Sequence, residues 1–228
     1  MKANTKSQRQ AGFSLLELLM VVLLLSIIVG ALFTQIERAQ VRYRVEDQKL
    51  DITQQEREFI DQFTRDLHQA GFPAVTVYGG QYDLTSNFTA AGVWSVSDTD
   101  LRMEGDVDGS GVVSVVEYSY VAGASPCPCL RRSATPKQPG LAPSAQVTGT
   151  NYTQVENVVP IAGQPIFAAY DANGNQLSSS VALANDNGLP NIKCVRISIT
   201  TQGTNKDSDT KRDIQVTMTG MARLVNNN

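Results

Sequence analysis

Oxygen-bearing residues between positions 106 and 117 follow the spacing of a calcium-binding loop. Such a loop supplies ligands from its first, third, fifth, seventh and twelfth positions and carries glycine at the sixth. Glycine is the sixth residue here as well, and the ligand positions are Asp106, Asp108, Ser110, Val112 and Glu117. Because residues 112–120 alternate like a strand, a β-hairpin turn with solvated aspartates is the alternative interpretation. Ca²⁺ is the one cofactor that the sequence suggests, with Asp106 and Asp108 as its principal ligands.

The chain contains three cysteines, Cys127, Cys129 and Cys194, which allow one disulfide and one spare thiol. Cys127 and Cys129 are separated by one proline, a spacing too tight for a comfortable mutual disulfide, and a structural zinc site would lack its fourth ligand. We therefore expect Cys194 to be bridged to Cys127 or Cys129. In an oxidising compartment this bridge would close a long loop and add about 2–4 kcal/mol of stability. A redox enzyme is disfavoured because the usual Cys-x-x-Cys is absent.

Residues 13–33 form an apolar segment in which Glu17 is the sole charged residue. The segment is long enough to span a bilayer as a helix. A leader with three basic and no acidic residues precedes it, so the positive-inside bias places the N-terminus in the cytoplasm and the chain after about Thr34 outside it. A carboxylate within a membrane costs roughly 2.5–3.5 kcal/mol, and Glu17 is therefore expected to be functional.

Gly12, Phe13 and Glu17, after the short basic leader, resemble the processing motif of type IV prepilins and pseudopilins. The resemblance implies that prepilin peptidase cuts between Gly12 and Phe13 and methylates the new amine of Phe13. It also implies that Glu17, then the fifth residue of the mature chain, pairs with the N-terminal ammonium of a neighbouring subunit during assembly. Two buried charges would thereby neutralise each other. A plain single-pass anchor with a stray glutamate is the alternative.

The C-terminal part of the chain resembles PilW-type minor pilins and, with the same plan, the J-type minor pseudopilins of type II secretion. The resemblance covers most of the chain, but its motifs are short: Glu117-Tyr118, Leu130-Arg131-Arg132 and Val195-Arg196-Ile197. A major pilin fits less well, because major pilins more often have a compact sheet closed by a C-terminal disulfide loop. The resemblance implies a minor subunit.

Residues 35–70 continue the helix beyond the apolar segment. They contain no proline and no internal glycine, and a helical stripe of apolar residues runs through Ile52, Phe59, Ile60, Phe63 and Leu67. A glycine and a proline follow at positions 71 and 73, so we predict one helix over residues 13–70. His68 lies on this helix, and we interpret it as solvated or packed at an edge because no candidate nucleophile accompanies it.

Beyond position 73, short β-branched runs alternate with Gly, Asn, Asp and Pro. We predict strands at 74–78, 93–96, 99–103, 112–120, 128–132, 155–159, 165–170, 192–201 and 213–219. A hairpin turn is expected at 171–174, and loops at 133–150 and 178–190. The fold class is α+β, with the long helix packed on a mainly antiparallel sheet as in type IV pilins. The predicted organisation is a leader (1–12), a membrane or filament-core helix (13–33), its amphipathic continuation (34–72) and a periplasmic β-rich domain (73–228).

Composition limits the function. The 228 residues suffice for one substantial core, and the formal net charge of −3 offers no general field for nucleic acid. We found no phosphate-binding glycine loop, serine elbow or paired histidines, so an enzyme is not expected. The prediction is a minor pilin in the bacterial inner membrane and then in the filament, with major and minor pilins, prepilin peptidase and the inner-membrane assembly platform as partners. The alternatives are a type II secretion pseudopilin and a tip module for adhesion or DNA uptake.

Overall fold

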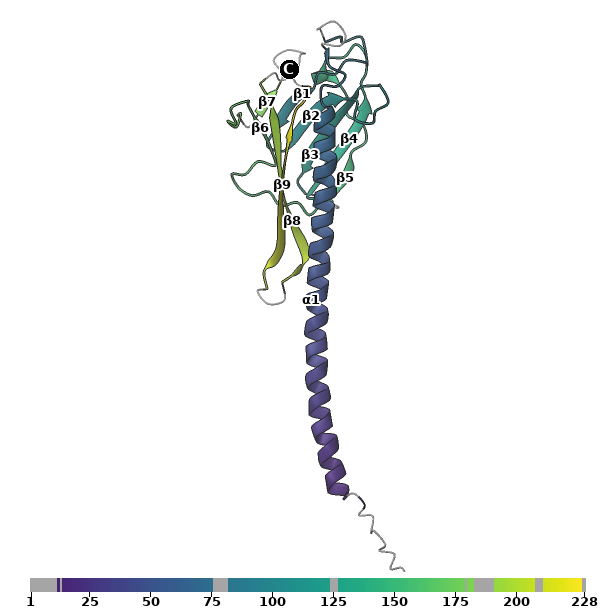
Figure 1. Cartoon of the computed structure of the whole chain (residues 1–228), viewed down its shortest axis with the longest axis vertical. Helices are drawn as coiled ribbons and strands as arrows, with labels where there is room; N and C mark the ends of the chain where they lie inside the picture. The colour runs from purple at the N-terminus through teal and green to yellow at the C-terminus, as the bar shows by residue number, and fades with distance from the viewer. Residues whose placement is uncertain are drawn as a thin grey trace, which may run out of the picture. The chain divides into compact units, whose positions relative to one another are not determined.

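The computed structural model describes residues 12, 14–75, 82–123, 127–178, 180–182, 191–207 and 211–226. By its internal contacts the chain divides into two compact units, Met1–Glu46 and Asp47–Asn228. Helix α1 (Leu15–Gln69) contributes residues to both units, whereas every described strand belongs to the second (Figure 1). The fold class is α+β with antiparallel sheets, as the sequence predicts.

Helix α1 begins two residues after the predicted start and ends one residue before the predicted end. Its C-terminus is closed by Gly71, which has a φ of +75° and follows the last helical turn. A left-handed residue at this position is the usual helix stop, and glycine adopts it without a steric penalty. A Cβ at Gly71 would also lie 2.9 Å from the backbone oxygen of Asn226. Glycine is thus required here both for the turn and for the close approach of the C-terminal segment.

The larger sheet has six strands in the order β5-β4-β3-β2-β1-β7, all antiparallel. Five of them follow one another along the chain as a meander, and the last arrives from far along the sequence to pair with β1 (Figure 1). Their bounds are β1 (Val93–Ser97), β2 (Asp100–Gly105), β3 (Ser114–Val121), β4 (Cys129–Pro136), β5 (Tyr152–Glu156) and β7 (Ser180–Ala182).

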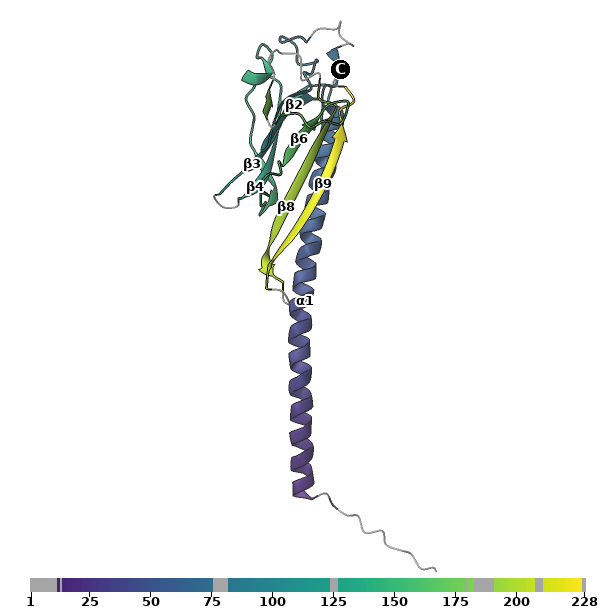
Figure 2. The same ribbon diagram turned by 90° about the vertical axis from the view of Figure 1, so that its left-hand side faces the viewer.

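The smaller sheet has three antiparallel strands in the order β6-β8-β9. They are β6 (Phe167–Tyr170), β8 (Cys194–Lys206) and β9 (Asp213–Arg223). Strands β8 and β9 form a long ribbon and lie side by side in Figure 2. Gly220 of β9 lies so near α1 that a Cβ there would be 2.5 Å from the Cγ2 methyl of Ile60. The ribbon therefore packs closely on the part of α1 that belongs to the second unit.

Most predicted strands are present with shifted ends. The strand predicted at 74–78 is wrong over residues 74 and 75, and residues 76–78 lie outside the described part. Strand β5 begins before the predicted 155–159. Strand β4 runs on to Pro136, into a predicted loop, because its backbone continues to pair with β3, and β7 lies within the predicted loop 178–190. The turn at 171–174 is confirmed: Gly174 has a φ of +81°, and the Asp171 amide donates to the Asn175 carbonyl at 3.0 Å.

One hydrophobic core lies between the two sheets and the C-terminal part of α1. The helix contributes the predicted stripe, of which Phe59, Phe63 and Leu67 are buried in the core and Ile60 packs against it. Both sheets contribute to the same cluster, for example through Tyr118 of β3 and Phe167 of β6. The rings of Phe63 and Tyr118 meet edge to face, with centroids 5.2 Å apart. Aromatic pairs of this geometry add stability beyond the area that they bury.

Asp66 of α1 is buried in this core and joins the helix to the larger sheet. Its Oδ2 accepts a hydrogen bond from the hydroxyl of Tyr118 at 2.6 Å and from Nε of Arg132 at 2.7 Å. Gln62, one turn earlier, donates to the other carboxylate oxygen at 2.6 Å. A buried carboxylate that accepts three hydrogen bonds and faces a guanidinium is compensated for its loss of water.

Replacing Asp66 with alanine is expected to lower the free energy of unfolding by about 3 kcal/mol, because Arg132 would remain partly buried without its partner. Urea denaturation of the full chain in detergent micelles would measure this loss. His68→Ala is the matched control on the same turn of the helix, since the His68 side chain is exposed, and it should change stability by less than about 0.5 kcal/mol. Equal effects of the two substitutions would contradict the assigned role of Asp66.

Candidate functional site

The described residues at the N-terminus place Glu17 in the first turn of α1. The amides of Glu17 and Leu18 donate to the Ser14 carbonyl at 3.0 and 3.1 Å, so the helix begins directly after the predicted processing site. A carboxylate in the first turn also interacts favourably with the positive end of the helix dipole. Gly12 is exposed, and no heavy atom lies within 4 Å of the place that a Cβ would take. Phe13 is outside the described residues.

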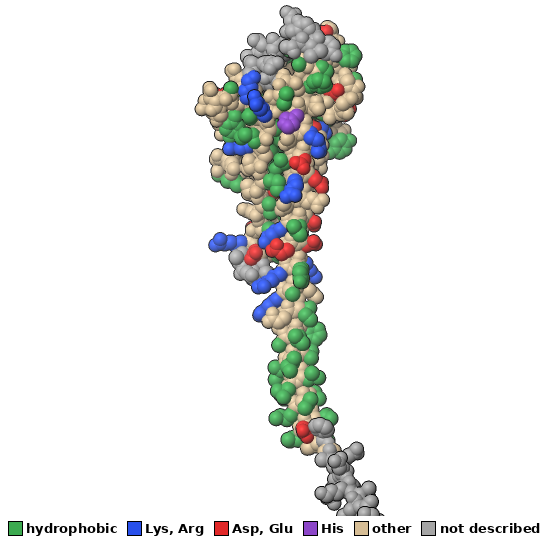
Figure 3. Space-filling view, viewed as in Figure 1, with side chains coloured by type: hydrophobic (Ala, Val, Ile, Leu, Met, Phe, Trp, Pro, Cys, Tyr) green, Lys and Arg blue, Asp and Glu red, His purple; other side chains and the backbone are tan. Residues whose placement is uncertain are grey.

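The side chains of α1 from residue 15 to 33 are exposed around the whole helix. Leu15 is 80% exposed, and Phe33 at the other end is still 62% exposed. Figure 3 shows this length of the helix covered with hydrophobic side chains. An 18-residue window within α1 has a mean hydropathy of 2.8, so the helix is long and apolar enough to cross a membrane. A helix that is apolar on every side needs lipid or other protein around it.

The family described as "Prokaryotic N-terminal methylation motif" matches residues 7–33. The chain has a type IV prepilin-like N-terminus. The match includes Gly12, Phe13 and Glu17 and therefore agrees with the processing motif predicted from these residues. This motif is typical of type IV pilins and pseudopilins, which are structural subunits processed by prepilin peptidase, and not of an enzyme family. Neither the curated proteins nor the solved structures gave a match.

The predicted calcium loop is brought together in part. Asp106, Asp108 and Ser110 lie in the connection between β2 and β3, whereas Glu117 is in the middle of β3. There Glu117 is opposite Arg102 of β2, and its Oε1 accepts from Nε and Nη2 of Arg102 at 2.7 and 2.6 Å. Glu117 is therefore wrong as a calcium ligand, because strand pairing commits its carboxylate to an arginine. Within the described residues no three His, Cys, Asp or Glu side chains form a metal-binding group.

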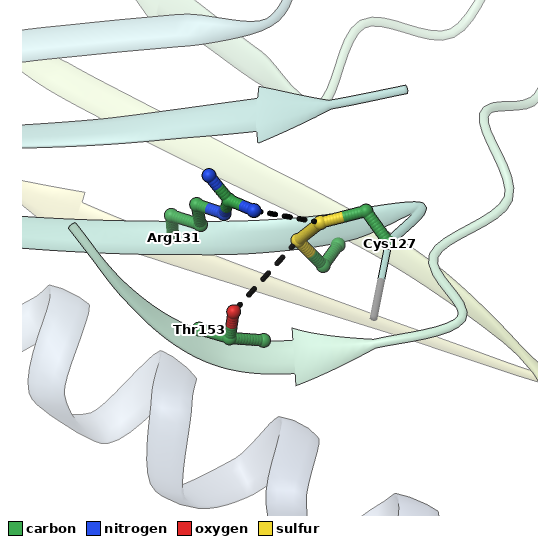
Figure 4. Close-up of a disulfide and its surroundings, with 4 residues drawn as sticks. Cys127, Arg131 and Thr153 are labelled. Atoms are coloured by element: carbon green, nitrogen blue, oxygen red, sulfur yellow. Dashed lines mark hydrogen bonds between the residues drawn. A yellow bond between two sulfur atoms is a disulfide. The ribbon is translucent and has the colours of Figure 1, made fainter. Parts of the chain in front are cut away.

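The cysteine prediction needs correction. Cys127 and Cys129 form a disulfide, with Cα atoms 4.4 Å apart (Figure 4). Cys194 is a free cysteine. This separation is at the short end of the usual range for disulfides and still within it. Cys194 opens β8 in the smaller sheet, where it pairs with Tyr170 and Arg223 across the strands. The predicted bridge to Cys194 is thus wrong, because Cys127 and Cys129 are bonded to each other and leave Cys194 as the spare thiol.

The disulfide has two polar neighbours. Nη2 of Arg131 donates to Sγ of Cys127 at 3.4 Å, and the hydroxyl of Thr153 lies 4.0 Å from Sγ of Cys129 (Figure 4). Cys129 is fully buried and Cys127 is half-buried. The disulfide therefore restrains the backbone at the start of β4, next to Thr153 of β5, and we interpret it as structural.

A buried ion pair was not predicted from the sequence. Nζ of Lys137 lies 3.7 Å from Oε2 of Glu104, and both side chains are fully buried. Lys137 also donates to the Thr89 carbonyl at 2.9 Å and lies 4.0 Å from the ring centre of Tyr82, whose hydroxyl donates to Glu104. Burial raises the pKa of Glu104 and lowers that of Lys137, and their mutual attraction opposes both shifts. These groups fasten residues 82–91 to the sheet.

Glu56 of α1 is a second buried acid that sequence reasoning missed. Its side chain is fully buried, and neither carboxylate oxygen has a described hydrogen-bond partner. Burial raises the pKa of Glu56 to about 7, and the nearby polar groups of Thr201 in β8, which form no full hydrogen bond with the carboxylate, oppose the rise only in part. Its burial could have been predicted from its position in the sequence. Glu56 lies four residues after Ile52 and three before Phe59, and therefore on the same face of the helix as the apolar stripe. It is a proton-binding position between the helix and the smaller sheet.

The burial of Glu56 predicts a pH dependence of stability. The folded chain holds this proton up to about pH 7, whereas the unfolded chain releases it near pH 4.5, so stability falls as the pH rises between these values. The loss from pH 5 to pH 8 should be roughly 2–4 kcal/mol, and Glu56→Gln should remove it. Urea denaturation of the full chain at both pH values would measure the difference. Glu58→Gln, at an exposed position two residues along the helix, should keep the wild-type dependence. If Glu56→Gln also keeps it, another group is responsible.

Proposed function

We propose that the protein is a minor pilin of the PilW type, which is inserted in the inner membrane and takes part in priming type IV pilus assembly. In this proposal the leader ends at Gly12, prepilin peptidase releases Phe13 as the new N-terminus, and Glu17 becomes the fifth residue. The partners are other major and minor pilins, the peptidase and the inner-membrane assembly platform. The protein acts as a subunit and turns over no substrate.

The observation that carries this proposal is the apolar surface of α1 over residues 15–33, interrupted by a single carboxylate. Lipid would surround these residues before assembly, and the helices of other subunits would replace lipid in a filament. Both environments are apolar, so the transfer costs the leucines little. Glu17 is different, because its charge is costly in either environment unless an opposite charge meets it. A free ammonium at Phe13 of a neighbouring subunit would be such a charge.

The second unit supports a minor role through its size and its cysteines. It carries two sheets rather than one compact sheet, and the disulfide that is present joins residues 127 and 129 instead of closing the C-terminal ribbon. Strands β3, β4 and β8 carry the short motifs that resemble those of PilW-type minor pilins. The J-type pseudopilins share these motifs, so a gene deletion is the direct discriminator: loss of pili supports the proposal, and loss of protein secretion with intact pili would overturn it.

Leader processing gives the first test. Gly12→Leu should leave the leader attached, because the larger side chain would obstruct the peptidase at the cut. The substitution itself is sterically free, since nothing lies within 4 Å of a Cβ at Gly12. Intact-mass analysis of protein from native membranes should find a wild-type chain that begins at methylated Phe13 and a variant of precursor mass. Ser14→Ala is the control on the other side of Phe13 and should be processed normally. A mature wild-type chain with any other first residue would contradict the proposal.

The charge of Glu17 gives the second test. Glu17→Gln should be processed normally but enter sheared filaments at a level at least roughly tenfold lower, since a buried ammonium would lose its partner. The amount in filaments relative to membranes, measured by immunoblot, reports this ratio. Glu37→Gln removes an exposed acid from the same helix and should assemble like the wild type. Normal incorporation of Glu17→Gln would refute the proposed pairing without affecting the processing site.

A further inference from the structure

The loop between β2 and β3 contains a buried carboxylate oxygen that nothing in the described structure satisfies. Asp106 is 5% exposed. Its Oδ2 accepts a hydrogen bond from the Gly111 amide at 2.9 Å, whereas its Oδ1 is buried and has no hydrogen-bond partner. A buried and unpaired carboxylate oxygen is costly, because water that solvates it in the unfolded chain is lost without replacement. The loop is therefore incomplete unless something binds Oδ1.

A second carboxylate faces the same place. Asp108 lies beside the Asp106 side chain, and its Oδ1 accepts from the Ser110 amide at 3.0 Å. Two carboxylates that approach each other repel unless a cation or a proton lies between them. A cation between the two side chains would supply a partner for Oδ1 and relieve this repulsion.

The surroundings of the loop add to its negative potential. The Asp106 amide donates to the Phe72 carbonyl at 2.9 Å, and the Gly71 amide donates to the Glu104 carbonyl at 2.9 Å. Gly105 approaches the backbone of Gln69, the last residue of α1, so closely that a Cβ would clash with it. The loop is therefore attached to the C-terminal end of α1, which carries the negative end of the helix dipole. A cation bound by the two carboxylates would therefore lie in a loop whose backbone is joined to this helix end.

We propose that the β2–β3 loop binds one Ca²⁺ ion through Oδ1 of Asp106 and the carboxylate of Asp108. The hydroxyl of Ser110 and the carbonyl of Val112 stand at the remaining positions of the loop spacing, and water completes the coordination. Hard oxygen ligands in an irregular loop suit Ca²⁺ better than Mg²⁺, which requires a near-ideal octahedron. Because Glu117 is paired with Arg102, the bidentate ligand of an EF-hand is missing. The expected dissociation constant is accordingly on the order of 10⁻⁴–10⁻³ M.

The bound ion would stabilise the attachment of the larger sheet to the helix. Asp106 is in the segment whose backbone holds residues 71 and 72, and these residues end α1. Holding both carboxylates on one ion restrains the loop in the conformation that makes these hydrogen bonds. The ion is therefore linked to the folded state and raises the unfolding temperature.

The test uses the full chain in detergent micelles, with CaCl₂ as the ligand. At ten times the dissociation constant, Ca²⁺ should raise the unfolding temperature by about 3–6 °C, and MgCl₂ at the same ionic strength by less than half of this. Isothermal titration with CaCl₂ should give about one ion per chain. Asp108→Asn, at an exposed position where folding is not at risk, should abolish the rise, and Asp106→Asn should do the same if it folds.

Asp171→Asn provides the matched control. Asp171 also closes a turn, but both of its carboxylate oxygens already accept hydrogen bonds, from Asn173 and Asn175. This variant should keep the full response to Ca²⁺. Equal shifts with Ca²⁺ and Mg²⁺, the absence of titration heat, or a full response in Asp108→Asn would each overturn the proposal and leave a water molecule as the partner of Oδ1.

Discussion

The second unit depends on the C-terminal part of α1 filling the space beside two sheets that share one core. The stripe of Phe59, Phe63 and Leu67 packs against both sheets, and the ring of Tyr118 meets Phe63 edge to face. Burial of this stripe supplies the non-directional part of the stability. The hydrogen bonds of Asp66 to Tyr118 and Arg132 supply the directional part, because they can form in only one register of helix and sheet. Packing and register are thus set by the same two turns of α1.

Buried charge recurs throughout the second unit in three different states of compensation. Asp66 is fully paired, and Glu104 has Lys137 and Tyr82 as partners. Glu56 has no described hydrogen-bond partner for either oxygen, and its pKa is raised to about 7, so it still binds a proton just below neutral pH. Asp106 is an intermediate case, with one oxygen satisfied and one not. The cost of burying a carboxylate is thus met in three ways: by an ion pair at Asp66 and Glu104, by a proton at Glu56 and, in our proposal, by a cation at Asp106.

The N-terminal part of α1 obeys the opposite constraint, since it buries nothing of its own. Its side chains over residues 15–33 are exposed on every side, so its stability as a helix rests on backbone hydrogen bonds and on its surroundings. Glu17 is the sole charged residue of this segment, so its surroundings must supply an opposite charge. The methylation motif matches residues 7–33, and in the proposed function processing at Gly12 would create a new ammonium four residues before this carboxylate.

The sequence by itself determined the helix, its end at Gly71, the apolar stripe, most strands and the prepilin-like N-terminus. These features are local: periodicity, turn residues and an uninterrupted apolar run act within a few residues of one another. Tertiary structure alone decided the partner of Cys127, the pairing of Glu117 with Arg102, the strand β7 and the burial of Glu56 and Asp66. Each of these depends on which residues meet across strands or between helix and sheet. A residue's type and spacing do not reveal such contacts, because they bring together segments that lie far apart along the chain.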